Sequence, residues 1–334
     1  MPKVHFLNVK DGDCNVIEHT SGHVTVIDVC NAAPVDMVKD QQLKIRARQF
    51  RSSLSGDFGQ KDFPVNPISY LKERSITSVF RFILSHPDMD HMDGIKAFFK
   101  AFSPLNFWDT DNCESKDFDE ESDGRYSEDD WNFYVELRDG KPDTDPKRLA
   151  LYSDAKGQFY NVGQDGSNGG DGLFVLAPTP ELVSSSNECL DFNDCSYVLL
   201  YKTRGHRILF GGDSHDRTWQ HILENHEADV KDIDLLIAPH HGRSSDRSYD
   251  FLEVVNPALT LFGNADSEHL AYNAFSSRNL PIITNNQAGC ILIDAEVNPM
   301  RAYATNYAYA KKVNASTSAS SRYPDYYYLG TVQR

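Results

Sequence analysis

The fold is decided by the ten-residue stretch SHPDMDHMDG at residues 85–94, which separates a predicted strand from a predicted helix. Residues 79–84 are apolar at five of six positions, which predicts a buried strand. Residues 94–102 repeat apolar side chains at helical spacing. A polar loop between a buried strand and a helix is typical of a functional site, because the strand holds the loop in place.

This loop carries four residues of the types that bind metal ions, all within a span of six. Imidazole and carboxylate groups are ligands of Zn²⁺ and Mn²⁺, and four of them so close together fit two ions better than one. Residues two apart on a tight loop tend to face the same way, so the first pair is expected on one ion and the second pair on the other. Two ions about 3.5–4 Å apart hold a hydroxide and stabilise the oxygens of a displacement. The four residues are His86, Asp88, Asp90 and His91.

Two further strand ends complete the predicted dinuclear site. Asp213 follows a predicted strand and is expected to bridge the ions, and with Asp90 it is a predicted catalytic carboxylate. His240 and His241 follow the strand predicted over 235–238. The phase of that strand favours His240 as the metal ligand and leaves His241 in a supporting position.

Other polar residues near these strand ends are candidates for supporting roles. Asp28 is expected to orient the histidine loop without binding metal. His215 is expected either to give a proton to the leaving group or to cap the helix that follows it. Three further residues have donors that could hold a phosphate oxygen, although an ordinary polar turn would also contain such residues. They are Arg243, Ser244 and Ser245.

Composition restricts the classes of function. The chain has 334 residues, 40% of them hydrophobic, which is enough for a large core. Net charge is −16, and the segment 109–130 alone has eleven acidic residues against Lys116 and Arg125. This balance disfavours an extensive nucleic-acid surface but leaves room for a small phosphate site. The acidic segment is predicted to be a solvated insertion that offers a surface to a protein partner, or that mimics nucleic acid and occupies the site in an inhibited state.

The remaining features indicate a cytoplasmic protein without a membrane segment. No run of eighteen apolar residues occurs, and the N-terminus has no signal-peptide core. The six cysteines form no CxxC pair, so reduced thiols are expected. We expect one domain over residues 1–300 with insertions at about 34–75 and 104–172, followed by a partly flexible tail over 301–334.

Six motifs in order resemble the metallo-β-lactamase fold superfamily, and in detail the β-lactamase-like domain of the competence protein ComEC and its soluble relatives. FLNVKDGD at 6–13 is similar to the opening "DVGQGD", and VID at 26–28 to the first-motif strand. HPDMDHMDG at 86–94 is similar to "HPDxDHxGG". The other three are NDCSYVL at 193–199 for "NxxSLVL", GGD at 211–213 for "TGD", and PHHGRSS at 239–245 for "HHGS".

The resemblance implies an αββα sandwich of two mixed sheets flanked by helices, with the metal site at one edge between the sheets. It implies that Asn193 and Ser196 orient the substrate and that His269 either faces the substrate or lies on a solvated helix. Asp88 stands where many relatives have a second histidine, and the third-motif histidine is absent. Because carboxylates make the site harder, Mn²⁺ competes with Zn²⁺ for the two positions.

The function that follows is a metal-dependent hydrolase, and the resemblance implies a nuclease or another phosphodiesterase of bacterial type. The expected substrate is a nucleic acid or nucleotide phosphodiester. One alternative is a hydrolase of a small molecule such as a cyclic nucleotide, nucleotide or ester, which the net charge favours. Another alternative is a regulatory or binding module whose metal site is structural.

Overall fold

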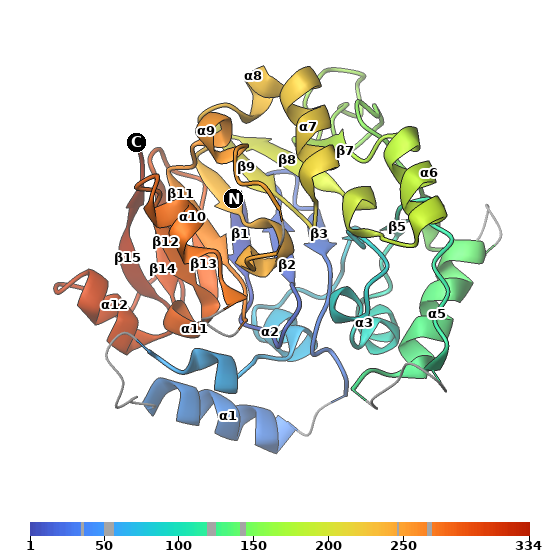
Figure 1. The fold of residues 1–334 in the computed structure, drawn as a ribbon. Coiled ribbons are helices and arrows are strands. Elements are labelled where there is room, and N and C mark those ends of the chain that lie inside the picture. The colour runs from blue at the N-terminus through green and yellow to red at the C-terminus, as the bar shows by residue number, and fades with distance from the viewer. Residues whose placement is uncertain (35–36, 50–56, 119–124, 141–144, 246, 266–268) are drawn as a thin grey trace.

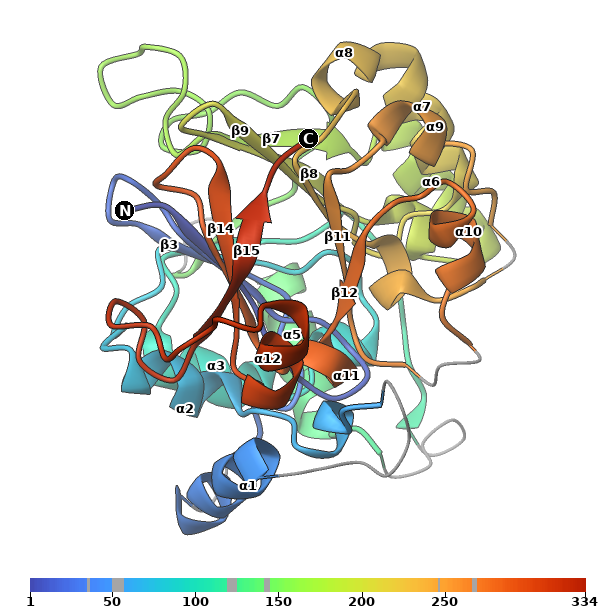
Figure 2. The ribbon, with the colours of Figure 1, turned by 90° about the vertical axis from the view of Figure 1, so that its left-hand side faces the viewer.

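Two β-sheets pack face to face, and helices cover the outer face of each (Figure 1, Figure 2). The sheets are mixed, so the predicted αββα arrangement is confirmed. The computed structural model describes residues 1–34, 37–49, 57–118, 125–140, 145–245, 247–265 and 269–334.

Within the described residues the larger sheet has nine strands in the order β15-β14-β13-β1-β2-β3-β4-β5-β6. Neighbours pair antiparallel from β15 to β3 and parallel from β3 to β6. The strands are β1 (Lys3–Phe6), β2 (Asn15–Glu18), β3 (Val24–Ile27), β4 (Arg81–Ile83), β5 (Asn106–Trp108), β6 (Lys147–Leu149), β13 (Ile291–Asp294), β14 (Met300–Ala304) and β15 (Tyr327–Val332).

The smaller sheet has six strands within the same residues, in the order β12-β11-β10-β9-β8-β7. The pairs from β9 to β12 are parallel, and β7 and β8 join them antiparallel. The strands are β7 (Leu173–Ala177), β8 (Val198–Thr203), β9 (His206–Phe210), β10 (Leu235–Ile237), β11 (Leu259–Phe262) and β12 (Ile282–Thr284).

The core between the sheets follows from the alternation of side chains along each strand. Val4 and Phe6 of β1 point into this core and pack with apolar side chains of the smaller sheet such as Leu199 and Phe210. The neighbours on the other face of the larger sheet, such as Val16 and Val26, pack under helices instead. Each sheet therefore buries both faces.

Helices close the two outer layers. On the larger sheet lie α2 (Pro67–Glu73), α3 (Ile95–Phe102) and α5 (Glu128–Asp139), whose apolar residues join one cluster with Phe82 and Phe107. On the smaller sheet lie α7 (Asp216–Asn225), α9 (Leu252–Val255) and α10 (Tyr272–Ser276). The other helices are α1 (Met37–Gln49), α6 (Pro180–Cys189), α8 (Glu227–Val230), α11 (Asn285–Ala288) and α12 (Tyr307–Val313).

The domain limits expected from the sequence need correction in two places. The limit at residue 300 falls at the start of β14, and the tail beyond it forms α12 and the edge strand β15 of the larger sheet. The segment 104–172 is not wholly an insertion, because β5 and β6 extend the same sheet at its other edge. No helix of the described residues combines the length and apolarity needed to cross a bilayer.

A buried histidine at the end of β2 links stability to pH. His19 is 2% exposed, its Nδ1 lies 3.0 Å from the Asp171 carbonyl oxygen, and its Nε2 lies 2.8 Å from Thr25 Oγ1. Burial lowers the pKa of His19 to about 4. Since protonation then favours the unfolded chain, stability is lost as pH falls from about 6.5 towards 4, by up to about 3 kcal/mol.

We therefore expect His19→Gln to lose less stability than the unmodified protein between pH 7 and pH 4.5. Urea unfolding at the two pH values measures this difference. Equal losses in both proteins would mean that His19 does not carry this pH dependence.

Candidate metal centre

The predicted ligands converge because their strands end at the same edge of the sandwich. The histidine loop follows β4, and Asp28 follows the parallel neighbour β3. Asp213 follows β9, and the turn Pro239–Gly242 follows its parallel neighbour β10. Parallel strands bring their carboxyl ends to one edge, so four loops from two sheets meet there.

Asp213 lies at the middle of the site, with buried histidine nitrogens around its carboxylate. The Nε2 atom of His91 lies 3.4 Å from Asp213 Oδ1, and those of His86 and His241 lie 3.8 and 3.7 Å from Oδ2. Two ligand atoms on one tetrahedral zinc ion are about 3.4 Å apart, so these separations fit bound ions better than direct hydrogen bonds.

Unsatisfied polar atoms support the same interpretation. The Nε2 atoms of His86, His91 and His241 are buried and have no hydrogen-bond partner, and neither has Asp213 Oδ1. Buried polar atoms in a folded protein are nearly always paired, so four orphans in one place indicate a cation site. Two groups could each hold an ion, with His91 in both: His86, His91 and Asp213, and Asp90, His91 and His241.

Each of these three histidines has a side-chain oxygen close to its other ring nitrogen. The Nδ1 atom of His91 lies 2.9 Å from Asp28 Oδ2, that of His241 lies 3.1 Å from Asp13 Oδ1, and that of His86 lies 3.1 Å from Ser85 Oγ. The Asp28 carboxylate keeps the proton of His91 on Nδ1 and leaves the Nε2 lone pair free for a metal, and the charge of Asp13 favours the same proton position in His241.

Carboxylates make the centre attractive to cations. Burial opposes a charge on His91, but Asp213 and Asp28 outweigh it and raise the pKa of His91 well above its usual value. Burial likewise opposes a charge on His241, and Asp13 with Asp213 raises the pKa of His241 to about 10. The carboxylates therefore attract positive charge to the centre, and bound divalent ions would supply that charge.

His240 differs from these three histidines at its Nδ1 atom, which lies 2.9 Å from Arg247 Nη2. Arginine can only donate, so this nitrogen must accept, and the neutral ring then carries its proton on Nε2. Burial, reinforced by His241 and Arg247 against the pull of Asp213, lowers the pKa of His240 to about 4. Its Nε2–H points towards Asp213 Oδ2 at 3.7 Å and has no lone pair to offer a metal.

The sequence-based choice between the two adjacent histidines is therefore reversed. His241 has the geometry of a ligand, and His240 has that of a proton-bearing neighbour. Strand phase fails here because both residues adopt left-handed backbone conformations, with φ of 53° at His240 and 58° at His241. Alternation holds only while the chain is extended.

Asp28 lies where its sequence position predicts. One carboxylate oxygen accepts a 2.7 Å hydrogen bond from the Ser85 backbone N–H, and the other faces His91. The equivalent support for His241 is Asp13, which was not predicted although it ends the DGD motif at 11–13. Gly12 allows the close approach of this loop, because a Cβ there would clash with the Asp90 carbonyl oxygen.

The two remaining carboxylates flank the centre. Asp88 Oδ2 lies 3.4 Å from His86 Nε2, so these two residues share one side as expected. Asp90 Oδ2 lies 3.5 Å from His241 Nε2, and its Oδ1 lies 4.0 Å from His91 Nε2. Asp88 is the more open of the two, with 43% of its side chain exposed against 22% for Asp90.

Two of the residues predicted to bind substrate instead support the centre. Ser196 Oγ accepts a hydrogen bond from the Asp213 backbone N–H at 3.2 Å, which fixes the bridging carboxylate. Ser245 Oγ accepts from Arg247 Nε at 2.8 Å. Arg247 also donates to the Ser214 carbonyl oxygen, so it ties the Asp213 loop to His240. Arg247 was not predicted, because it stands in a polar run without a distinguishing pattern.

The other predicted residues lie in or beside the loops that carry Asp213 and the turn at 239–242. Arg243 has a buried Nε without a hydrogen-bond partner, and its charge helps to lower the pKa of His240. His215 is half-buried, and its ring centroid lies 6.3 Å from that of His240. His269 is exposed, and its carbonyl oxygen accepts from the backbone N–H of Ser244, also exposed. Asn193 begins the 3₁₀ turn Asn193–Cys195.

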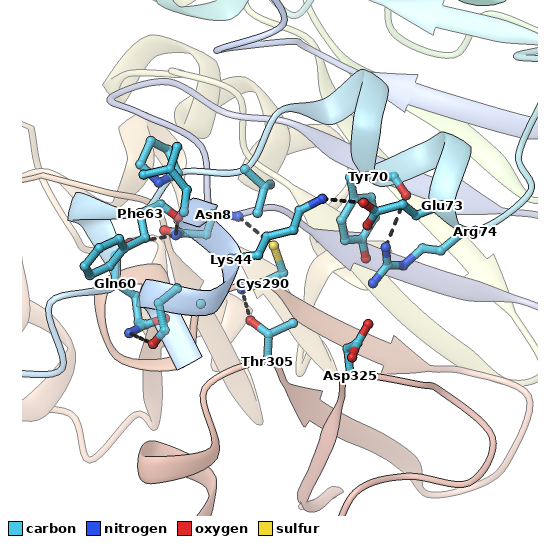
Figure 3. A pocket seen from close by; sticks show the side chains of 15 residues that line it. Asn8, Lys44, Gln60, Phe63, Tyr70, Glu73, Arg74, Cys290, Thr305 and Asp325 are labelled. Atoms are coloured by element: carbon cyan, nitrogen blue, oxygen red, sulfur yellow. Dashed lines mark hydrogen bonds and ion pairs between the residues drawn. The ribbon is translucent and has the colours of Figure 1, made fainter. Parts of the chain in front are cut away.

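A separate pocket lies under α1, lined by other residues (Figure 3). Its charged groups are paired: Lys44 donates to Glu73, and Arg74 packs 3.6 Å from the Tyr70 ring centroid. Lys44 is the first of four basic residues between positions 44 and 51. Its ion pair with Glu73 directs its charge to this pocket. Arg51 lies outside the described residues.

Comparison with known proteins finds solved structures that are similar to the chain at low sequence identity. No family model and no curated protein sequence matches it. The metallo-β-lactamase fold protein YhfI from Bacillus subtilis is 12% identical with a TM-score of 0.43, over 85% of this chain and 96% of that one. A diphosphatase of the PhnP family is 13% identical with a TM-score of 0.38, over 82% and 81%. Unliganded yeast PDE1 is 12% identical with a TM-score of 0.38, over 85% and 98%.

Proposed function

We propose that the chain is a metal-dependent hydrolase that cleaves phosphodiesters. The observation that carries the proposal is the set of unpartnered, buried Nε2 atoms of His86, His91 and His241 around Asp213. With Asp88 and Asp90, these residues would hold two divalent ions, either Zn²⁺ or Mn²⁺. Bound ions supply an acidified water and charge neutralisation.

The surrounding residues favour an anionic substrate. Arg243 lies close enough to His240 for its charge to lower the pKa of that histidine, and we assign its guanidinium group to a phosphate oxygen. The His240 Nε2 lies 3.7 Å from Asp213 Oδ2, and Arg247 keeps the proton on that nitrogen by occupying Nδ1. His215 and His269 remain candidates for the leaving-group side. A neutral ester would carry no negative charge for the Arg243 guanidinium group to neutralise.

The chain's motifs resemble those of the ComEC β-lactamase-like domain, which supports nucleic acid or nucleotides as the substrate. The experiment uses metal-stripped protein with Mn²⁺ or Zn²⁺ restored separately. The substrates are bis(p-nitrophenyl) phosphate, single-stranded DNA, duplex DNA, RNA and cyclic dinucleotides, and Asp213→Ala is run beside the unmodified protein. We expect metal-dependent cleavage of at least one phosphodiester that Asp213→Ala abolishes. Bound metal without any cleavage would overturn the proposal in favour of a structural metal site.

A further inference from the structure

The first part of the acidic insertion is anchored beside the metal centre, although many of its carboxylates are exposed. Asn112 donates a 2.7 Å hydrogen bond to the hydroxyl of Tyr134 on α5. Arg138 on the same helix donates to the Glu114 carbonyl oxygen at 2.7 Å. The Cys113 backbone N–H donates to Asn187 on α6 at 2.9 Å. The loop over 112–116 is therefore fixed between two helices.

Lys116 is the cation that this anchored loop presents to the centre. Its Nζ lies 3.6 Å from Asp88 Oδ1 and 3.3 Å from Glu114 Oε1, and 5.5 Å from the Trp131 ring centroid. The side chain is 20% exposed. The other oxygen of Asp88 faces His86, so the ammonium group stands at the open side of the predicted ligand set.

The second cation of the insertion is Arg125, which lies next to a different loop of the metal centre. Arg125 contacts Asp11, in the loop whose Asp13 faces His241. The insertion thus has eleven acidic residues between 109 and 130, and its two basic residues both reach the surroundings of the metal centre. Acidic residues of the same segment, including Asp111, Asp117 and Asp129, are exposed.

We propose that Lys116 binds the substrate phosphate and makes the site selective for small phosphodiesters. The inference rests on the proposed function and names its substrate class. A metal ion on Asp88 would compete with Lys116 for that carboxylate charge, which leaves the ammonium group with Glu114 as its remaining anion and lets it also pair with a phosphate oxygen. The exposed carboxylates of the insertion repel a long polyanion, whereas a short diester needs only the immediate surroundings of Lys116 and the metal centre.

The test compares Lys116→Met with the unmodified protein on two substrates that share a leaving group. Bis(p-nitrophenyl) phosphate carries a charge, and dimethyl p-nitrophenyl phosphate carries none. A charge-assisted hydrogen bond predicts a loss of about 10- to 100-fold in kcat/KM for the charged substrate, mostly through KM. Hydrolysis of the neutral substrate should change less than about twofold, and Lys116→Arg should restore part of the loss.

Lys96→Met is the matched control, because Lys96 pairs with Asp129 on the outer side of the same insertion at 3.3 Å, and both side chains are exposed. It should leave both substrates unaffected. Equal losses on both substrates in Lys116→Met, or loss of bound metal, would show a structural role and overturn the inference. No loss on the charged substrate would also overturn it.

Failure of the proposed function has a different signature. If the unmodified protein hydrolyses neither substrate with either metal, binding of inorganic phosphate to the metal-loaded protein, measured by calorimetry, decides the role of Lys116. Binding that Lys116→Met weakens at least tenfold supports the phosphate site, and unchanged binding refutes it. Selectivity is read from kcat/KM for thymidine 5′-p-nitrophenyl phosphate against that for a 20-nucleotide single strand at low salt. Faster cleavage of the strand would contradict the small-substrate class.

Discussion

Asp213→Asn is expected to lower kcat/KM for a phosphodiester by about 1,000-fold or more, and to reduce the bound metal. Asp213 Oδ1 faces His91 and its Oδ2 faces both His86 and His241, so one carboxylate lies beside histidines of both ligand groups. An amide of the same shape removes the charge and leaves the fold intact. Steady-state kinetics with Mn²⁺, together with metal analysis by mass spectrometry, measures both effects.

Asp250→Asn provides the control for this substitution. The Asp250 side chain is 89% exposed, and it makes a 3.8 Å ion pair with Arg278, which lies outside the ligand set. Its replacement should leave activity and metal content unchanged. If Asp213→Asn kept two ions and full activity, the bridging role would be wrong.

His241→Ala and His240→Ala are expected to differ in kind. His241 offers a lone pair on Nε2 because Asp13 faces its Nδ1, so its loss should remove at least one ion and lower kcat/KM by about 100-fold or more. His240 carries its proton on Nε2 because Arg247 faces its Nδ1, so its loss should retain both ions. Activity in His240→Ala should fall by about 100-fold or more, as when one proton donor is removed.

The pair of variants has a clear opposite outcome. Loss of metal in His240→Ala with full metal in His241→Ala would restore the assignment made from strand phase. Thermal unfolding of both variants with excess metal should be measured alongside, because a destabilised His241→Ala would lose metal for another reason.

The αββα fold was predictable because its signals are local. The loop at 85–94 lies between an apolar run that predicts a strand and a helical pattern that predicts a helix. Strands such as Leu173–Ala177 and Leu259–Phe262 coincide with apolar runs of the sequence. The edge strand Tyr327–Val332 was missed because its stability comes from pairing with β14, which local composition does not reveal.

The candidate site was predictable only as a set of residue types. His86, Asp90, His91 and Asp213 meet as expected, because each stands at a strand end. Which of His240 and His241 has the geometry of a ligand depends on two consecutive left-handed backbone conformations. The roles of Asp13 and Arg247 depend on contacts between loops that are distant in the sequence. Lys116 stands in an acidic run, so its sequence context predicts no role. Only its position next to Asp88 points to the substrate-binding role that the variants above test.

The central claim is that two ions share Asp213, and anomalous diffraction from crystals grown with Mn²⁺ tests it most directly. We expect two anomalous peaks about 3.5–4 Å apart, one beside His86 and Asp88 and one beside Asp90 and His241, with Asp213 between them. A single peak, or two peaks that include His240 and exclude His241, would contradict a dinuclear centre bridged by Asp213 with His241 as a ligand.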